Sequence, residues 1–153
     1  MNEMVADSKQ YDLCGQVIGA AMKVHSALGP GFLESVYQNA LIWELQKSGL
    51  KVDAQRPITV DYDGQVVGLF TADVLVNDSL IVGLKANQLL AKAHEVQLVN
   101  YLIATAIDEG LLLNFGAERL EYKRKFRLPK QEQVSLLFDR FILLILFILS
   151  NES

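Results

Sequence analysis

Cysteine is nearly absent from this sequence, which has a single one, Cys14. One cysteine cannot form an intrachain disulfide framework or a cysteine-based zinc site, so a reducing, cytoplasmic location is expected. Cys14 lies in a helical pattern and is predicted to be a small core residue. The first residues, MNEMVADSKQYD, include acidic side chains and lack an apolar run, so they do not predict a secretory signal.

Basic residues are also in short supply. The chain has 14 Lys plus Arg against 18 Asp plus Glu, a formal net charge of -4. This balance argues against a protein that coats nucleic acid non-specifically. The one basic cluster, Lys123, Lys125, Arg127 and Lys130, accompanies the alternating segment Leu120–Leu128. It has two interpretations: an edge strand whose lysines block edge-to-edge pairing, or a contact with a nucleic-acid backbone.

A helix needs about 20 apolar residues in succession to cross a bilayer, and no apolar run in this sequence is that long. The segment Phe141–Leu149 reads FILLILFIL and follows Asp139 and Arg140. Because an exposed segment of this kind invites aggregation, we expect a terminal helix or strand that packs on the domain or on a second copy of the chain. Association with a membrane surface is the less favoured alternative.

The rest of the composition suits one globular domain with a real core, since 51% of the 153 residues are hydrophobic and 21% are charged. Apolar residues at helical spacing predict helices over Tyr11–Leu28, Leu33–Ser48 and Lys92–Asp108. Alternating and β-branched runs predict strands over Lys51–Gln55, Ile58–Tyr62, Gln65–Val76, Leu80–Lys85, Leu111–Phe115 and Leu120–Leu128. This order predicts an α+β fold with a mixed central sheet flanked by helices.

The stretch Thr71–Ala86 reads as a hairpin with a turn at Asn77-Asp78-Ser79. Pairing across this turn places Asp73 opposite Gly83, and alternation then points Asp73, position 83 and Lys85 to one face. Charges on a mostly apolar hairpin are costly unless they pair or bind something. An Asp73–Lys85 ion pair and a metal-dependent active site are both open interpretations.

Two helices contribute further polar candidates. Glu34 lies in the first turn of its helix, where the dipole favours a carboxylate, so simple dipole compensation is one interpretation. His94, Gln97 and Tyr101 form a polar stripe on the third helix, which a solvated edge would also explain. The apolar face expected for this third helix consists of Val96, Val99, Leu102, Ile103 and Ala106.

Several of these stretches together resemble a known family of small bacterial proteins, the GxxExxY family. Its naming signature is matched by Gly31-Phe32-Leu33-Glu34-Ser35-Val36-Tyr37. Its "ADLLV" and "IVELKA" strands are similar to Thr71–Val76 and Ile81–Ala86, and the match continues through His94–Leu102 and Leu112–Gly116. The resemblance covers about Tyr11 to Phe126, which predicts a domain over residues 1–128 and a tail over residues 129–153 outside the match.

The resemblance places the chain in the PD-(D/E)XK nuclease-like superfamily and implies a restriction-endonuclease-like core in αβββαβ order. It implies that Glu34 and Asp73 are ligands of Mg²⁺ or Mn²⁺, with nucleic acid as the substrate. Lys85 would orient the attacking water or stabilise charge on the phosphate. Gln97 and Tyr101 resemble the accessory Gln-x-x-x-Tyr element of exonuclease-like relatives.

The sequence departs from the pattern at Gly83, where the family has the acid of its E-x-K motif. Losing one of three carboxylates predicts a weakened metal site and a catalytically compromised nuclease-like domain. One alternative is an active Mg²⁺-dependent nuclease in which Glu34 and Asp73 suffice. Another is a non-enzymatic interaction or dimerisation module that uses the apolar tail.

Overall fold

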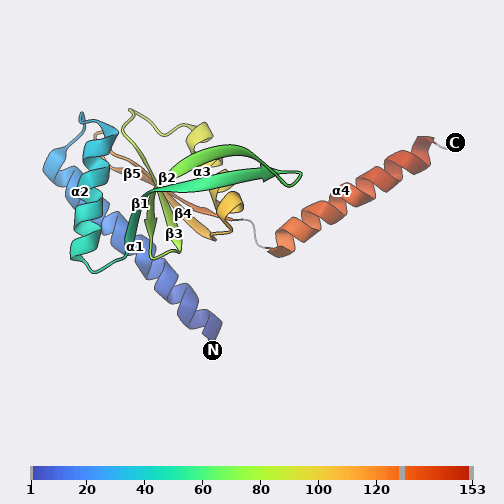
Figure 1. The fold of residues 1–153 in the computed structure, drawn as a ribbon, viewed down its shortest axis with the longest axis horizontal. Coiled ribbons are helices and arrows are strands. Elements are labelled where there is room, and N and C mark those ends of the chain that lie inside the picture. The colour runs from blue at the N-terminus through green and yellow to red at the C-terminus, as the bar shows by residue number, and fades with distance from the viewer. Residues whose placement is uncertain (1, 128–129, 152–153) are drawn as a thin grey trace.

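The computed structural model describes residues 2–127 and 130–151, and it describes the side-chain surroundings of residues 12–127 and 139–151. Two helices come first, then three strands, a third helix, two more strands and a terminal helix (Figure 1). The elements are α1 (Asn2–Leu28), α2 (Glu34–Lys47), β1 (Val52–Tyr62), β2 (Gln65–Val76), β3 (Leu80–Lys85), α3 (Lys92–Thr105), β4 (Glu109–Asn114), β5 (Glu121–Phe126) and α4 (Lys130–Asn151).

The five strands form one mixed sheet in the order β1-β2-β3-β4-β5. Strand β2 is antiparallel to both β1 and β3, β4 lies parallel to β3, and β5 returns antiparallel to β4. The parallel pair is possible because α3 forms the crossover between β3 and β4. The predicted α+β fold with a mixed, helix-flanked sheet is therefore confirmed.

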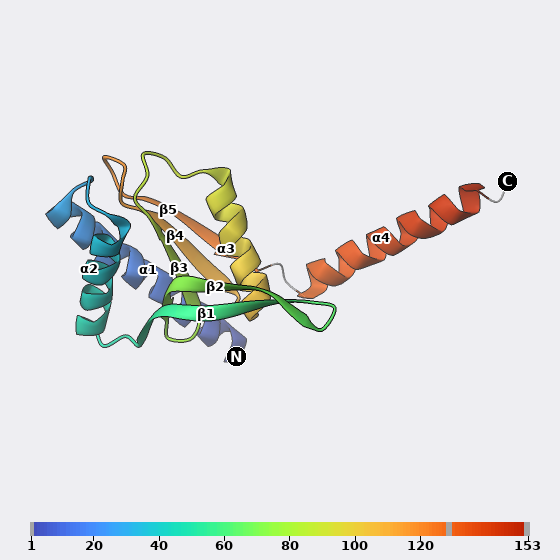
Figure 2. The ribbon, with the colours of Figure 1, turned by 45° about the horizontal axis from the view of Figure 1, so that its top comes forward.

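Helices cover both faces of the sheet, but the apolar core is thicker on one face than on the other. Helices α1 and α2 pack on one face, and α3 packs on the other (Figures 1 and 2). Alternation along β2 sends Val74 and Val76 into the first core and Leu75 into the second. Among the residues whose burial the structure describes, the first core contains 16 and the second contains 7, so the layer under α3 is much the thinner one.

Several element boundaries differ from those predicted. Strand β1 is continuous through Pro57, because β1 lies at the edge of the sheet, where a missing N–H can face outward. Helix α1 begins at Asn2, well before Tyr11. Helix α3 ends at Thr105, because Ala106 adopts a left-handed φ of 57°.

The predicted apolar face of α3 was partly wrong. Val96 and Ile103 are each 50% exposed, whereas Leu98 and Leu102 are buried against the sheet. The periodicity of this helix allows either set to face inward, since apolar residues occur on more than one side. The packing places Leu98 and Leu102 in the core.

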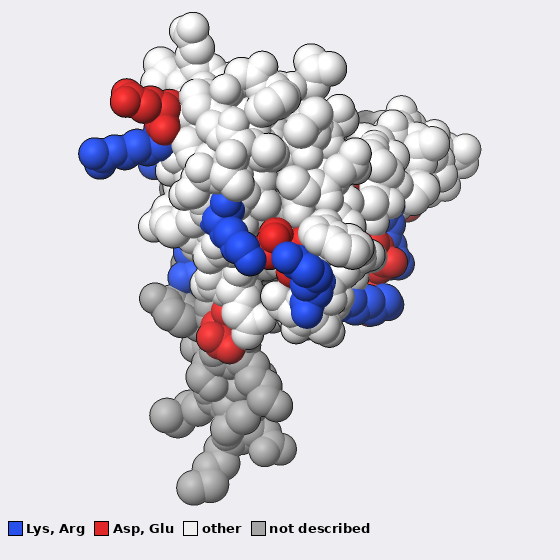
Figure 3. Space-filling model, turned by 90° about the vertical axis from the view of Figure 1, so that its left-hand side faces the viewer, with Lys and Arg blue, Asp and Glu red and all other residues white. Residues whose placement is uncertain are grey.

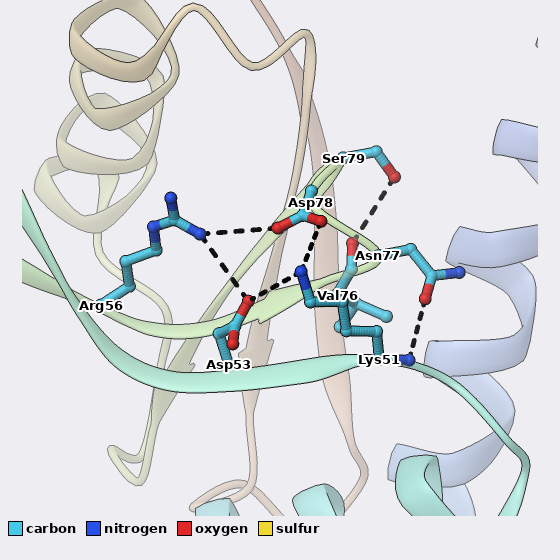
Figure 4. Close-up of polar contacts among 7 residues, drawn as sticks. All are labelled: Lys51, Asp53, Arg56, Val76, Asn77, Asp78 and Ser79. Carbon is cyan, nitrogen blue, oxygen red and sulfur yellow. Dashed lines mark hydrogen bonds and ion pairs between the residues drawn. The ribbon is translucent and has the colours of Figure 1, made fainter.

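Both predicted hairpin turns are present. Asp63 and Gly64 have φ values of 52° and 73°, as expected of a two-residue hairpin turn between β1 and β2. Val76 pairs with Leu80 across the second turn, as predicted. Beside that turn lies a surface cluster of four charged residues, Lys51, Asp53, Arg56 and Asp78 (Figure 4).

Helix α4 projects away from the sheet in Figures 1 and 2. Its apolar side chains from Phe141 to Leu149 are between 40% and 66% exposed, so they do not pack on the domain as one alternative predicted. Packing on a second copy of the chain stays a prediction. Within the part of the chain that the structure describes, no helix is long and apolar enough to cross a membrane.

Candidate functional site

Strands β2 and β3 part next to Asp73. Their ladder ends at the pair Val74 and Val82, so Asp73 lies just beyond the last paired residues. The Leu84 N–H donates a hydrogen bond of 2.8 Å to Oδ2 of Asp73. The carboxylate thus bridges the two strands where the backbone ladder has stopped, which fixes its position.

A small pocket with a volume of about 140 Å³ lies at this parting point. Asp73, Gly83 and Lys85 all line it, so the structure brings these three positions together. Gln97 and Tyr101 line it from α3. Among the ion pairs of the described residues, none joins Asp73 to Lys85, so the simple ion-pair interpretation is not supported.

Glu34 approaches the same group of charges from α2. Burial raises the pKa of the Glu34 carboxyl, the negative charge of Asp73 raises it further, and Lys85 opposes the shift. Burial likewise raises the pKa of Asp73, against the Leu84 N–H and the charge of Lys85. The fold therefore brings two half-buried carboxylates and one ammonium within electrostatic reach of one another.

Tyr37, the tyrosine of the GxxExxY signature, has a role that the sequence did not reveal. It is fully buried, and its hydroxyl donates a hydrogen bond of 2.5 Å to the Gly29 carbonyl and accepts one of 3.1 Å from the Phe32 N–H. Its ring stacks on Phe115, with centroids 4.8 Å apart. These contacts fix the turn that leads into α2, and so they position Glu34 in the first turn of that helix.

The polar stripe of α3 also faces the sheet at this point. Tyr101 stacks on Phe70 with ring centroids 3.8 Å apart, a partner that the sequence analysis missed. Burial and the charge of Asp73 both raise the pKa of the Tyr101 phenol. His94 lines the small pocket too, but its Nδ1 accepts a hydrogen bond from the Ala91 N–H at the start of α3.

The segment after Lys85 is held by β4. Oδ1 of the buried Asn114 accepts hydrogen bonds from the Asn87 N–H and the Gly116 N–H, at 3.0 and 3.1 Å. A Cβ atom at Gly116 would lie 2.4 Å from the backbone of Ala86 and Asn87. Only glycine permits this close approach, which anchors the chain immediately beyond Lys85.

Glu34 and Asp73 have the right chemistry to bind a hard divalent cation, but they are two carboxylates where the family pattern has three. Oxygen ligands are those that Mg²⁺ prefers, and Glu34 and Asp73 supply them. Across the described residues, no group of three or more histidines, cysteines, aspartates and glutamates is placed to hold a metal ion. Position 83 can accept a Cβ atom, because one built there would lie 3.4 Å from Cδ1 of Leu112.

Two residues of the basic cluster, Lys125 and Arg127, are paired with acids. Nζ of Lys125 lies 2.6 Å from Glu95, and the Arg127 guanidinium lies 2.6 Å from Asp108. This pairing favours the edge-strand interpretation over a contact with a nucleic-acid backbone. Figure 3 shows the same mixing of acidic and basic side chains on the side of the molecule that carries α2.

The chain is similar to a solved structure and to one family of proteins. A solved structure described as "Crystal structure of SSO0001" is 16% identical, with a TM-score of 0.48, and the alignment covers 72% of this chain and 57% of that one. The chain thus spans little more than half the length of that protein. No curated protein matches significantly. A family model described as the PD-(D/E)XK nuclease superfamily matches residues 11–125, and the chain therefore belongs to this superfamily.

Proposed function

We propose that this domain binds the phosphate backbone of nucleic acid at the pocket of Asp73 and Lys85, and that its capacity for phosphodiester hydrolysis is strongly reduced. The observation behind this proposal is the absence of a carboxylate at Gly83, which lines the same pocket. The site keeps the ammonium and two acids of the superfamily pattern but lacks the third acid.

The retained residues have definite chemical uses. A divalent cation, when bound, would activate water and neutralise charge on the phosphate, and Glu34 and Asp73 would hold it. Lys85 offers a compact positive charge to a phosphate oxygen. Gln97 and Tyr101, at the α3 side of the pocket, can donate hydrogen bonds to a bound nucleic acid.

The energetics of the two acids favour a weak site rather than none. Burial raises the pKa of both Glu34 and Asp73, so their ionised forms are costly without a compensating positive charge. Lys85 supplies one, and a cation would supply more. Loss of a residue that supports a metal commonly costs roughly 10- to 100-fold in affinity, and loss of a direct ligand is at least as severe.

The test is a titration of the full-length protein with Mn²⁺ by calorimetry, comparing wild type with Gly83→Glu. We expect Gly83→Glu to bind at least roughly tenfold more tightly than wild type and to gain cation-dependent cleavage of nucleic acid. Gly83→Gln is the matched control, because it adds nearly the same volume without a carboxylate. It should behave like wild type.

The active-nuclease alternative predicts a different result. If wild type binds Mn²⁺ and cleaves nucleic acid efficiently, and Asp73→Ala abolishes both, then two carboxylates suffice and the proposed loss of activity is wrong. If Gly83→Glu folds but gains no affinity for Mn²⁺, position 83 is not the missing ligand position.

One observation favours a second candidate, an interaction module. The run Phe141–Leu149 exposes apolar side chains along a full helical segment, which soluble surfaces rarely do. Self-association through residues 129–153 would cover it, and this tail would then form a unit separate from residues 1–128. Sedimentation of the full chain beside a double variant, Leu143→Glu with Leu146→Glu, tests this: an unchanged mass would exclude it.

We also propose membership of the GxxExxY group within the superfamily. The support is structural: the tyrosine and the glutamate of the signature cooperate, since Tyr37 fixes the turn that positions Glu34. If the signature matched by chance, its tyrosine would not be expected to fix the turn that positions its glutamate.

A further inference from the structure

A groove with a volume of about 1020 Å³ lies between α3 and the β1–β2 hairpin, beside the candidate site. Its walls come from Thr59, Val60 and Phe70 of the hairpin and from one side of α3. Figure 2 shows α3 alongside this hairpin. Val96 and Ile103, which the sequence predicted to be core residues, are half exposed because they line this groove.

The groove is continuous with the candidate site. Gln97 and Tyr101 line both the groove and the small pocket that contains Asp73 and Lys85. A ligand that lies along the groove therefore has one end next to these two charges. The volume of the groove, about 1020 Å³, is several times the about 140 Å³ of the pocket, so most of such a ligand would contact the groove.

The lining offers flat, apolar surfaces. The Phe70 and Tyr101 rings are stacked within 16° of parallel and both line the groove. Val60, Val96 and Ile103 extend the apolar surface to either side. Aromatic side chains in a groove are the usual platforms on which unpaired bases stack, and every base has a face that can do so.

The charge of the lining does not suit a duplex. Among the residues of the groove there is one cation, Lys92, and one acid, Asp61. A duplex presents mainly phosphates, and binding it normally requires several basic contacts. Two basic residues in and just after β5, Lys125 and Arg127, are already paired with acids. Amide groups, such as Asn100 in this groove, suit the polar edges of exposed bases better.

We infer that this groove binds an unpaired strand of nucleic acid through the faces of its bases, and that it delivers the backbone of that strand to the pocket of Asp73 and Lys85. The inference rests on the proposed function, which places phosphate at that pocket. It adds the substrate class: single-stranded rather than duplex nucleic acid, with the stacked pair of Phe70 and Tyr101 as the base platform.

The experiment measures binding of a fluorescent oligodeoxythymidylate by anisotropy, alone and annealed to its complement, with the full-length protein and a chelator present. The chelator removes any contribution from a divalent cation. We expect the single strand to bind roughly tenfold more tightly than the duplex. Val96→Glu, on the wall of the groove, should weaken binding of the single strand roughly tenfold, because it removes apolar surface and repels phosphate.

Leu69→Glu is the matched control. Leu69 is 70% exposed, precedes Phe70 on β2 and so points to the other face of the hairpin. It introduces the same charge outside the groove and should leave affinity unchanged. Ile103→Glu, at another position of the groove, should weaken binding of the single strand to a similar extent. It keeps the inference testable if Val96→Glu folds poorly.

Equal affinity for single strand and duplex would overturn the inference, and so would equal losses in Val96→Glu and Leu69→Glu. These failures are distinguishable from failure of the proposed function. Binding of the nucleic-acid strand is measured without free divalent cations, whereas the test at Gly83 reads cation affinity and cation-dependent cleavage. A gain of cation affinity in Gly83→Glu, together with no preference for the single strand, would contradict only the groove.

Discussion

The hydroxyl of Tyr37 donates a hydrogen bond of 2.5 Å to the carbonyl of Gly29, across the turn that connects α1 to α2. The same hydroxyl accepts a hydrogen bond from the Phe32 N–H. One buried side chain thus satisfies two backbone groups of the turn, and the glutamate of the signature follows directly after that turn. Tyr37, which has no proposed part in catalysis, in this way helps to position Glu34, which is proposed as a metal ligand.

Tyr37→Phe should lower the free energy of unfolding by roughly 1–3 kcal/mol, because it leaves the Gly29 carbonyl and the Phe32 N–H without their partner while the ring keeps its stacking on Phe115. Urea denaturation measures this loss. Tyr62→Phe, at a position that is 75% exposed, is the control and should change stability by less than about 0.5 kcal/mol. Equal effects of the two substitutions would contradict the role of Tyr37.

A buried ion pair ties β5 to β4. The Arg124 guanidinium lies 3.1 Å from Oε1 of Glu109, whose side chain is only 5% exposed. Arg124→Leu should destabilise the fold by about 3–5 kcal/mol, because it leaves the Glu109 carboxylate buried without its partner. The double variant Arg124→Leu with Glu109→Leu should recover most of that loss. A double variant that is no more stable than Arg124→Leu would mean that the charge of Glu109 is not the cause.

The raised pKa of Asp73 makes stability depend on pH. Because the folded protein holds this proton more tightly than the unfolded chain, the contribution of Asp73 to the free energy of unfolding declines as pH rises from about 3.9 through its folded pKa. Asp73→Asn cannot ionise, yet its amide oxygen can still accept from the Leu84 N–H. Its stability relative to wild type should therefore increase with pH over this window, as measured by denaturation at several pH values. A constant difference would contradict the prediction.

Two glycines near Lys85 should respond very differently to alanine. Gly116→Ala would place a Cβ atom 2.4 Å from backbone atoms of Ala86 and Asn87 and should cost about 3 kcal/mol or more. Gly83→Ala meets only Cδ1 of Leu112 at 3.4 Å and should cost less than about 1 kcal/mol. Thermal unfolding of the two variants compares them directly. Similar melting temperatures would show that the segment after Lys85 can shift to accommodate a side chain.

The hairpin that contains Asp73 and Lys85 was predictable because its information is local. Alternation and the turn residues determine the register, and the structure has Val76 opposite Leu80 as expected. The shared face of Asp73, Gly83 and Lys85 follows from that register alone. Glu34 could be suggested only through the family resemblance, since nothing in its own helix indicates that Asp73 lies nearby.

The missed features all depend on contacts between distant segments. Tyr101 stacks on Phe70 of another element, and the stripe of α3 gave no sign of that partner. Val96 and Ile103 fit the helical period of a core face, yet the β1–β2 hairpin does not pack against them, and a groove lies between the hairpin and α3. Periodicity reports that a side chain is apolar. It does not report whether a neighbouring element closes over it.

The unequal layers on the two faces of the sheet bear on how the site opens. Of the residues with described burial, 7 are buried under α3 and 16 on the other face. Helix α3 should therefore detach at lower free energy, and its amide hydrogens should exchange with solvent sooner than those of α2. Gln97 and Tyr101 would leave with α3, whereas Glu34 would stay in place. A nucleic-acid strand bound to residues of both layers would slow that exchange, because it binds only the form in which α3 is packed on the sheet. A ligand bound at the site would then stabilise the packing of α3, the less stable layer, on the sheet.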